Sequence, residues 1–144
     1  MLVQQILKMK SGEGVVTLAP GTTLADAARM LARHKIGAVI VSPDGARVAG
    51  ILSERDIVRE LGRRGPECMS DRVDDVMTAK IITCTRSEGS GEVLAKMTSG
   101  RFRHMPVMEG DEMVGLISIG DVVKAQLAEL AMEKEALESM IKGF

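Results

Sequence analysis

The chain has 144 residues, a formal net charge of −1, and 45% hydrophobic and 27% charged residues. A chain of this length suffices for one ordinary domain that buries about 68–70% of its unfolded surface. The near-zero net charge argues against nucleic acid or an anionic membrane as a partner, and no apolar run approaches the roughly 18 residues that span a bilayer. The first residues carry no signal-peptide pattern, so we expect a cytoplasmic protein.

The residues offer little chemistry for metal binding or catalysis. Cys68 and Cys84 form no CxxC pair, and His34 and His104 lie at no metal-ligand spacing from them, so we expect reduced thiols and no metal site. There is no P-loop or Rossmann fingerprint, and neither histidine lies in a catalytic motif. We therefore expect that the chain has no catalytic activity. Because the chain has no Trp and no Tyr, any bound base must be held mainly by aliphatic side chains and backbone.

The predicted elements of the first half follow the order β-α-β-β-α. They are, in chain order, a strand over 15–18, a helix over 24–33, strands over 38–42 and 48–52, and a helix that starts at Ser53 and ends near 62–66. The first helix is predicted from apolar residues at i, i+3, i+4 and i+7, with Thr22 in the preceding turn as its cap. Turn-forming residues between the two strands indicate a hairpin.

The second half of the chain repeats the first. Three segments recur in it: 15–18 as 81–84, 36–41 as 102–107, and the lead-in 3–7 as 73–77. A half of about 65 residues has only a marginal core by itself. We therefore expect an α/β (α+β) fold in which two β-α-β-β-α repeats pack with pseudo-two-fold symmetry. The expected divisions are repeat 1 at 1–66, repeat 2 at 67–124 and a C-terminal helix extension at 125–144.

One motif ends each repeat: glycine, two apolar residues, serine, two further residues and aspartate. It contains Gly50, Ser53 and Asp56 in the first repeat, and Gly115, Ser118 and Asp121 in the second. One interpretation is structural, because Ser-x-x-Asp at a helix start resembles a capping box. The other is functional: helix N-terminal amides attract phosphate, a carboxylate one turn further can accept both ribose hydroxyls, and glycine permits close backbone approach. The residue types alone leave both open.

This motif at the end of each repeat resembles the ribose- and phosphate-contacting motif of CBS (cystathionine-β-synthase-type) domains. The segment RFRHMPV over 101–107 resembles the family's entry into its central strand, and residues 53–58 and 118–124 resemble second-helix starts of small bacterial stand-alone CBS pairs. The resemblance runs from about residue 3 to the C-terminus. It implies a tandem CBS pair that binds an adenine nucleotide (AMP, ADP, ATP or NAD(H)) as a regulatory sensor. The alternative is a structural or protein-interaction CBS module without a nucleotide.

The resemblance also implies a set of ligand contacts. Asp56 and Asp121 would hold ribose, with Ser53 and Ser118 near phosphate. The remaining candidates are basic or strand residues: Arg55, Arg103, His104, Met105, Pro106, Thr17 and Thr83. Gly37 and Ala38 stand where the second repeat has Arg103 and His104, so we expect unequal clefts, for which Arg55 and Lys124 could compensate. A solvated strand entry is the plainer interpretation of Arg103 and His104, and core packing that of Met105 and Pro106.

The C-terminal segment is predicted to be one long helix. Residues 122–142 contain no Gly or Pro and many helix formers. Apolar residues recur at a 4-3-4-3-4 spacing that only Lys134 interrupts, which gives one narrow apolar seam. The seam could fold onto the chain's own core or pack against a second copy. We favour a homodimer, with a regulated protein, not identified by the sequence, as a further partner.

Overall fold

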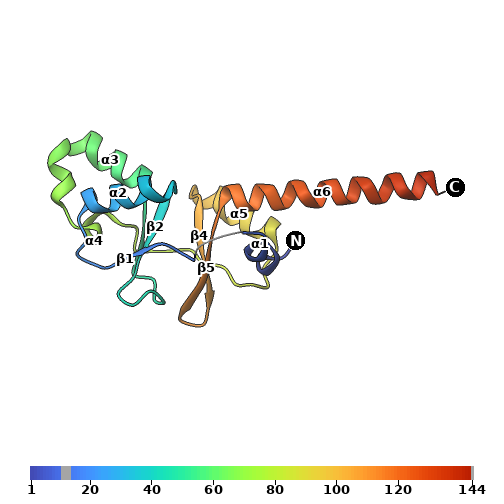
Figure 1. Cartoon of the computed structure of the whole chain (residues 1–144), viewed down its shortest axis with the longest axis horizontal. Helices are drawn as coiled ribbons and strands as arrows, with labels where there is room; N and C mark the ends of the chain where they lie inside the picture. Colours follow the sequence, from blue (N-terminus) through green and yellow to red (C-terminus); the bar gives the residue numbers. More distant parts are fainter. Residues whose placement is uncertain (11–13, 144) are drawn as a thin grey trace. The chain divides into compact units, whose positions relative to one another are not determined.

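Short strands lie beside helices in the computed structural model, which describes residues 1–10 and 14–143. In chain order the elements are α1 (Val3–Met9), β1 (Thr17–Leu18), α2 (Leu24–His34), β2 (Ala38–Val41), β3 (Gly50–Ser53), α3 (Glu54–Arg64), the 3-10 turn η1 (Pro66–Ser70), α4 (Val73–Val76), α5 (Ser90–Gly100), β4 (His104–Glu109), β5 (Glu112–Ser118) and α6 (Ile119–Lys142) (Figure 1). The predicted α/β class and the long C-terminal helix are confirmed.

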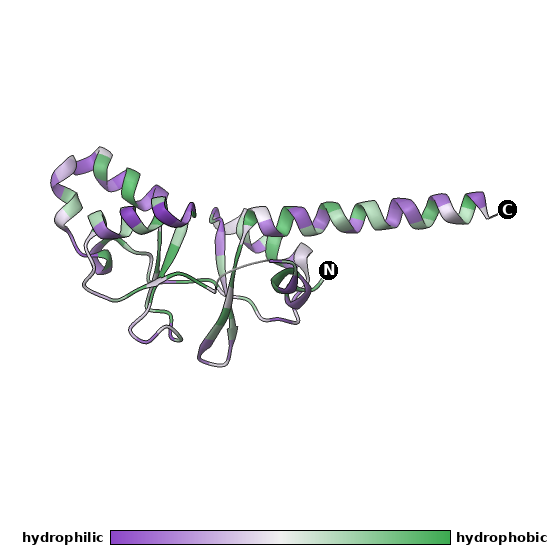
Figure 2. Cartoon of the chain, in the orientation of Figure 1, coloured by the Kyte–Doolittle hydropathy of each residue, from purple (hydrophilic) through white to green (hydrophobic). Residues whose placement is uncertain are grey.

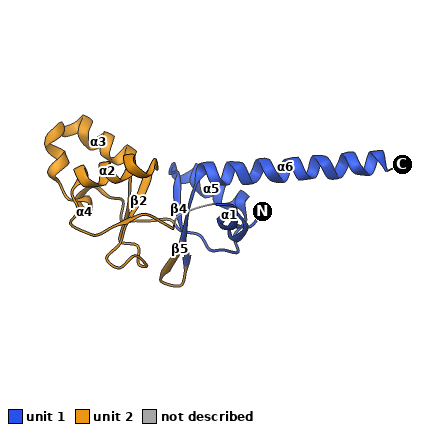
Figure 3. Cartoon of the chain, viewed as in Figure 1, with its two compact units in different colours: residues 1–12, 83–108, 115–144 blue, residues 13–82, 109–114 orange. Residues whose placement is uncertain are grey.

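The chain forms two compact units, which are described separately (Figure 3). Unit 1 holds the described residues of 1–12, 83–108 and 115–144, and unit 2 those of 13–82 and 109–114. Each lead-in segment belongs with the other repeat. The helix α1 precedes repeat 1 but lies in unit 1 with β4 and α6, and α4 precedes repeat 2 but lies in unit 2 with β3 and α3.

Unit 2 is built on a three-stranded sheet. Strand β1 pairs in parallel with β2, and β2 pairs antiparallel with β3, as the predicted hairpin requires. One side of the sheet is covered by α2, whose predicted apolar face is buried through Leu24, Ala27 and Leu31. The cap of α2 differs from the prediction. Thr23, not Thr22, accepts the Asp26 amide at 3.2 Å, because the Thr22 hydroxyl donates to the Ala19 carbonyl inside the turn.

Unit 1 repeats this plan with a shorter first strand. The strands β4 and β5 form a two-stranded sheet. The strand expected over 81–84 is reduced to a single parallel bridge between Cys84 and Val107. The chain turns immediately afterwards, because the Thr85 amide donates to the Glu88 carboxylate at 2.7 Å instead of to a strand. The core of the unit lies between this sheet and helices α1, α5 and α6, and contains Val3, Ile6, Val93, Met97, Met105, Val107, Ile117, Val122 and Ala125.

Candidate functional site

The start of α3 carries the first copy of the motif. Because β3 runs directly into α3, Ser53 is both the last strand residue and the helix N-cap. The Ser53 hydroxyl accepts the Asp56 amide at 3.3 Å, and the Asp56 carboxylate accepts the Ser53 amide at 2.9 Å. These two reciprocal bonds form a complete capping box, which satisfies amides that the helix leaves without an intrahelical partner.

The start of α6 carries the second copy with the same geometry. The Asp121 amide donates to the Ser118 hydroxyl at 3.1 Å, and the Ser118 amide donates to the Asp121 carboxylate at 2.9 Å. The next backbone bond is also repeated. The Glu54 amide donates to the Gly37 carbonyl at 2.9 Å, and the Ile119 amide donates to the Arg103 carbonyl at 2.8 Å. The structural interpretation of the motif is therefore realised in both repeats.

The motif glycines have a packing role that the sequence interpretation missed. A Cβ atom at Gly50 would lie 2.3 Å from the Met77 sulfur, and one at Gly115 would lie 2.6 Å from a Leu7 methyl carbon. Met77 and Leu7 hold equivalent places in the two lead-in segments. The space beside each glycine is therefore filled by a lead-in side chain rather than left for a ligand, which corrects the expectation of close ligand approach at these positions.

The two motif carboxylates differ in their surroundings. The Asp56 side chain is only 8% exposed and meets the Arg59 guanidinium at 3.3 Å. The Asp121 side chain is 22% exposed, and the Lys10 ammonium lies 2.9 Å from its Oδ2 atom. Lys10 also donates to the Leu116 carbonyl at 2.7 Å, which holds its ammonium beside the start of α6.

Asp121 is ionised at neutral pH. Partial burial acts to raise the pKa of its carboxyl, but the Ser118 amide and the Lys10 ammonium outweigh burial and hold the pKa below its ordinary value of 3.8. Lys10 was missed by the sequence interpretation. The signal that could have found it is the lead-in repeat, which continues from 3–7 and 73–77 to Lys10 and Lys80 at the same offset.

The remaining predicted contacts are spread over both units. In unit 2, Thr17 is half-buried in β1 and Arg55 is exposed in the first turn of α3. In unit 1, Arg103 is exposed just before β4, and His104 is half-buried at its start. Met105 and Pro106 are buried in the core, and Thr83 is exposed outside any strand with its carbonyl 3.4 Å from the Lys96 ammonium.

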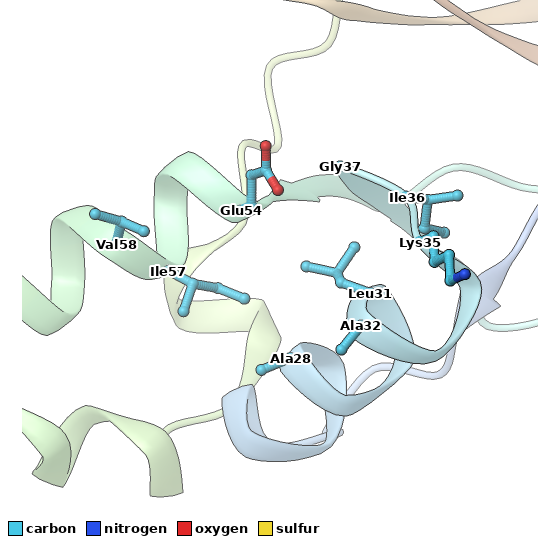
Figure 4. Close-up of a pocket in the computed structure, with 9 residues that line it drawn as sticks. All are labelled: Ala28, Leu31, Ala32, Lys35, Ile36, Gly37, Glu54, Ile57 and Val58. Carbon is cyan, nitrogen blue, oxygen red and sulfur yellow. The ribbon is translucent and has the colours of Figure 1, made fainter.

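An open groove of about 580 Å³ lies between α2 and α3 in unit 2 (Figure 4). Its lining residues are Ala28, Leu31, Ala32, Lys35, Ile36, Gly37, Glu54, Ile57 and Val58. Figure 4 shows the Leu31 and Ile57 side chains directed toward one another across it. The groove is mostly apolar and is lined by neither Ser53 nor Asp56. In the described part of the chain, no group of three or more His, Cys, Asp or Glu side chains could hold a metal ion.

Comparison with known proteins decides the family. The model of the CBS domain matches residues 3–63 and 73–128. This chain belongs to the CBS domain family. The two matches make it a tandem CBS pair, in agreement with the internal repeat and with the two capping boxes at equivalent helix starts. None of the described helices is long and apolar enough to cross a membrane.

Several CBS proteins are similar to this CBS pair over most of its length. A CBS-domain containing protein of solved structure from Agrobacterium tumefaciens is 40% identical, with 88% of this chain and 99% of that chain covered and a TM-score of 0.83. The mitochondrial CBS domain-containing protein CBSX3 of Arabidopsis thaliana is 37% identical over 84% of this chain, which spans 61% of that protein. A CBS domain protein from Pyrobaculum aerophilum complexed with AMP shares the fold, at 24% identity and a TM-score of 0.75 over 92% of this chain and 99% of that chain.

Proposed function

We propose that this CBS pair is a regulatory module that binds an adenine nucleotide (AMP, ADP, ATP or NAD(H)) and catalyses no reaction. The observation that carries the proposal is the pair formed by Asp121 and Lys10 at the start of α6. It sets a partly exposed, ionised carboxylate 2.9 Å from an ammonium group that is itself 41% exposed. The AMP complex of the Pyrobaculum aerophilum protein supports a nucleotide of this class.

The Asp121 carboxylate suits the ribose. An ionised carboxylate is an acceptor with two oxygens, and it can receive both hydroxyls of a ribose. Hydrogen bonds to a charged group contribute about 1.5–3 kcal/mol each. Asp121 keeps its charge at neutral pH because the Ser118 amide and Lys10 stabilise the ionised form. The same carboxylate would therefore cap α6 and hold the sugar.

The groups around Asp121 suit a phosphate. The N-terminus of α6 carries a partial positive charge that favours an anion, although the Ile119 and Asp121 amides already donate to the Arg103 carbonyl and the Ser118 hydroxyl. Lys10 adds a full positive charge at this helix start. Arg103 lies close by along the backbone, since its carbonyl accepts the Ile119 amide at 2.8 Å, and its side chain is exposed. We propose that Lys10 leaves Asp121 for the phosphate when a nucleotide binds, with Arg103 as a second cation.

The first repeat is proposed as the weaker site. Its carboxylate, Asp56, is nearly buried and already meets Arg59. Its strand entry has Gly37 and Ala38 in place of Arg103 and His104. A nucleotide there would have to displace Arg59 from a carboxylate that is only 8% exposed. We propose that the second repeat binds first, and that Ser53 and Arg55 serve a second ligand at higher concentration.

The alternative is a structural or protein-interaction module without a nucleotide. The observation in its favour is that both capping boxes are complete without any ligand. A serine and an aspartate at these positions are then explained by helix capping alone. The apolar groove between α2 and α3 would offer such a module a contact surface.

A cytoplasmic location also stays part of the proposal, and the free cysteines Cys68 and Cys84 suit a reducing compartment.

Calorimetric titration of the ligand-free chain with AMP tests the proposal, with Asp121→Asn and Asp56→Asn as a matched pair. Both variants keep the side-chain size and lose the charge of a capping residue. We expect Asp121→Asn to weaken AMP binding about 10- to 100-fold, the equivalent of one lost bond to a charged group. Asp56→Asn should lower the melting temperature to a similar extent but leave the first binding event unchanged. A flat titration of the native chain with all four nucleotides would favour the interaction module instead.

A further inference from the structure

No contact with the described part of the chain hides the C-terminal half of α6 from solvent. Residues 130–143 are all exposed. In α6 only Val122 and Ala125 are buried, where the first turns pack on α5 and α1. Most helical stability in proteins comes from packing an apolar face against a neighbour. Within the described residues, the exposed half of α6 has no such neighbour.

The apolar seam that the sequence predicted runs along α6 from its first turns through the exposed half. Val123, Leu127, Leu130, Leu137 and Ile141 are 43, 60, 60, 61 and 75% exposed, and Lys134 occupies the one polar position of the seam. Figure 2 shows apolar residues recurring along the helix to its C-terminal end. Val122 and Ala125 are buried on the other side of the helix, so the seam faces away from the core of unit 1. Spacings of three and four are those of a two-stranded coiled coil.

We propose that α6 pairs with α6 of a second copy in antiparallel orientation. The spacing 4-3-4-3-4 reads the same in both directions, so a reversed copy meets the seam residue for residue. Leu127 then lies opposite Leu137, Val123 opposite Ile141, and Leu130 opposite Lys134, whose aliphatic stem can cover a leucine while its ammonium reaches water. An interface between two copies related by a two-fold axis requires such self-complementarity. Binding to a different protein would not require the seam to be self-complementary.

The charges beside the seam select the antiparallel orientation. In this alignment Lys124 of each helix flanks Glu138 of the other, which gives two pairs of opposite charge. The two Glu133 side chains meet near the two-fold axis, but each also faces Lys134 of the other helix. In a parallel pair the two Lys134 side chains would face one another, and Glu133 would face Glu138 on both sides. Flanking charges of this kind set partner and orientation in coiled coils, and the parallel arrangement places like charges together.

Cysteine cross-linking of the full chain tests the proposal independently of any nucleotide. The variants are Val123→Cys and Ile141→Cys, oxidised separately and after mixing. Both sites are exposed, so the fold is not at risk, and the native Cys68 and Cys84 are buried. We expect the mixture to form a covalent heterodimer, and neither variant to link to itself. The native chain and a mixture of Val123→Cys with Ser139→Cys, on the opposite side of the helix, serve as controls without a link.

Two results would overturn the proposal. Self-linking of either variant would mean that equal positions face one another, and hence a parallel pair. No link in the mixture, together with an unchanged sedimentation coefficient after Leu130→Glu, would mean that another protein or another face of the chain covers the seam.

Discussion

The substitution Gly115→Ala separates a packing role of the motif glycine from a ligand role. A Cβ at this position would lie 2.6 Å and 3.2 Å from the two methyl carbons of Leu7, so the Leu7 side chain must shift. Overpacking of this kind typically costs about 1–3 kcal/mol. At roughly 3 °C per kcal/mol for a chain of this length, we expect the melting temperature to fall by about 6 °C.

A double-mutant cycle with Leu7→Ala measures the contact directly. Leu7→Ala alone removes a partly buried side chain and should destabilise the chain. Combined with Gly115→Ala it also removes the clash, so the double variant should lose at least about 1 kcal/mol less than the sum of the two single variants. Urea unfolding of the native chain, the two single variants and the double variant gives the coupling free energy between residues 7 and 115. Strict additivity, or a Gly115→Ala variant with native stability but no AMP binding, would refute the packing role.

Three further predictions concern single side chains of unit 1. Ser118→Ala removes the cap of α6 and should cost about 0.5–2 kcal/mol in thermal unfolding; an unchanged melting temperature would contradict the observed capping box. Because the folded-state pKa of Asp121 lies below 3.8, its stabilisation is full above the unfolded-state pKa and is lost as pH falls through the folded-state value. The native chain and Asp121→Asn should therefore differ in stability at neutral pH and converge in acid, and a difference independent of pH would argue against the shift. Burial, followed by the nearby Glu88, raises the pKa of Cys84 to about 11, so a thiol reagent at neutral pH should modify Cys84 only as fast as the chain unfolds, and fast labelling of folded protein would count against it.

The repeat made most of the fold predictable from sequence. The recurrence of 36–41 as 102–107 and the two Ser-x-x-Asp motifs predicted the strands after each first helix and the starts of α3 and α6. Capping preferences did not decide between two adjacent threonines that could both cap the same helix. Thr22 and Thr23 are both good caps, and the choice between them depends on the Ala19 carbonyl that binds Thr22. The shortening of the strand at Cys84 likewise depends on a bond from the Thr85 amide to a side chain, Glu88.

Of the candidate site, the structure confirms the capping geometry of the motif serines and aspartates, while their contacts to a ligand stay a prediction. The capping geometry was predictable because the Ser-x-x-Asp spacing fixes it locally. Lys10 was not found, because it lies 111 positions from Asp121 and only the fold brings them together. The roles of Gly50 and Gly115 were misjudged for the same reason, since Met77 and Leu7 come from the lead-in segments. Each of these contacts joins a motif to a lead-in segment far from it in the sequence, so the spacing within a single motif does not reveal it.

The most direct test of the central claim is a nuclear magnetic resonance titration of the ¹⁵N-labelled, ligand-free chain with AMP. Absence of bound nucleotide is readily checked by absorption near 260 nm, because the chain has no Trp and no Tyr. We predict saturable shifts of the Ser118 and Asp121 amide resonances at lower AMP concentration than those of Ser53 and Asp56, while the hairpin turn around Gly45 stays unchanged. No shift at millimolar AMP, or shifts confined to residues outside both motifs, would contradict a nucleotide site at these helix starts.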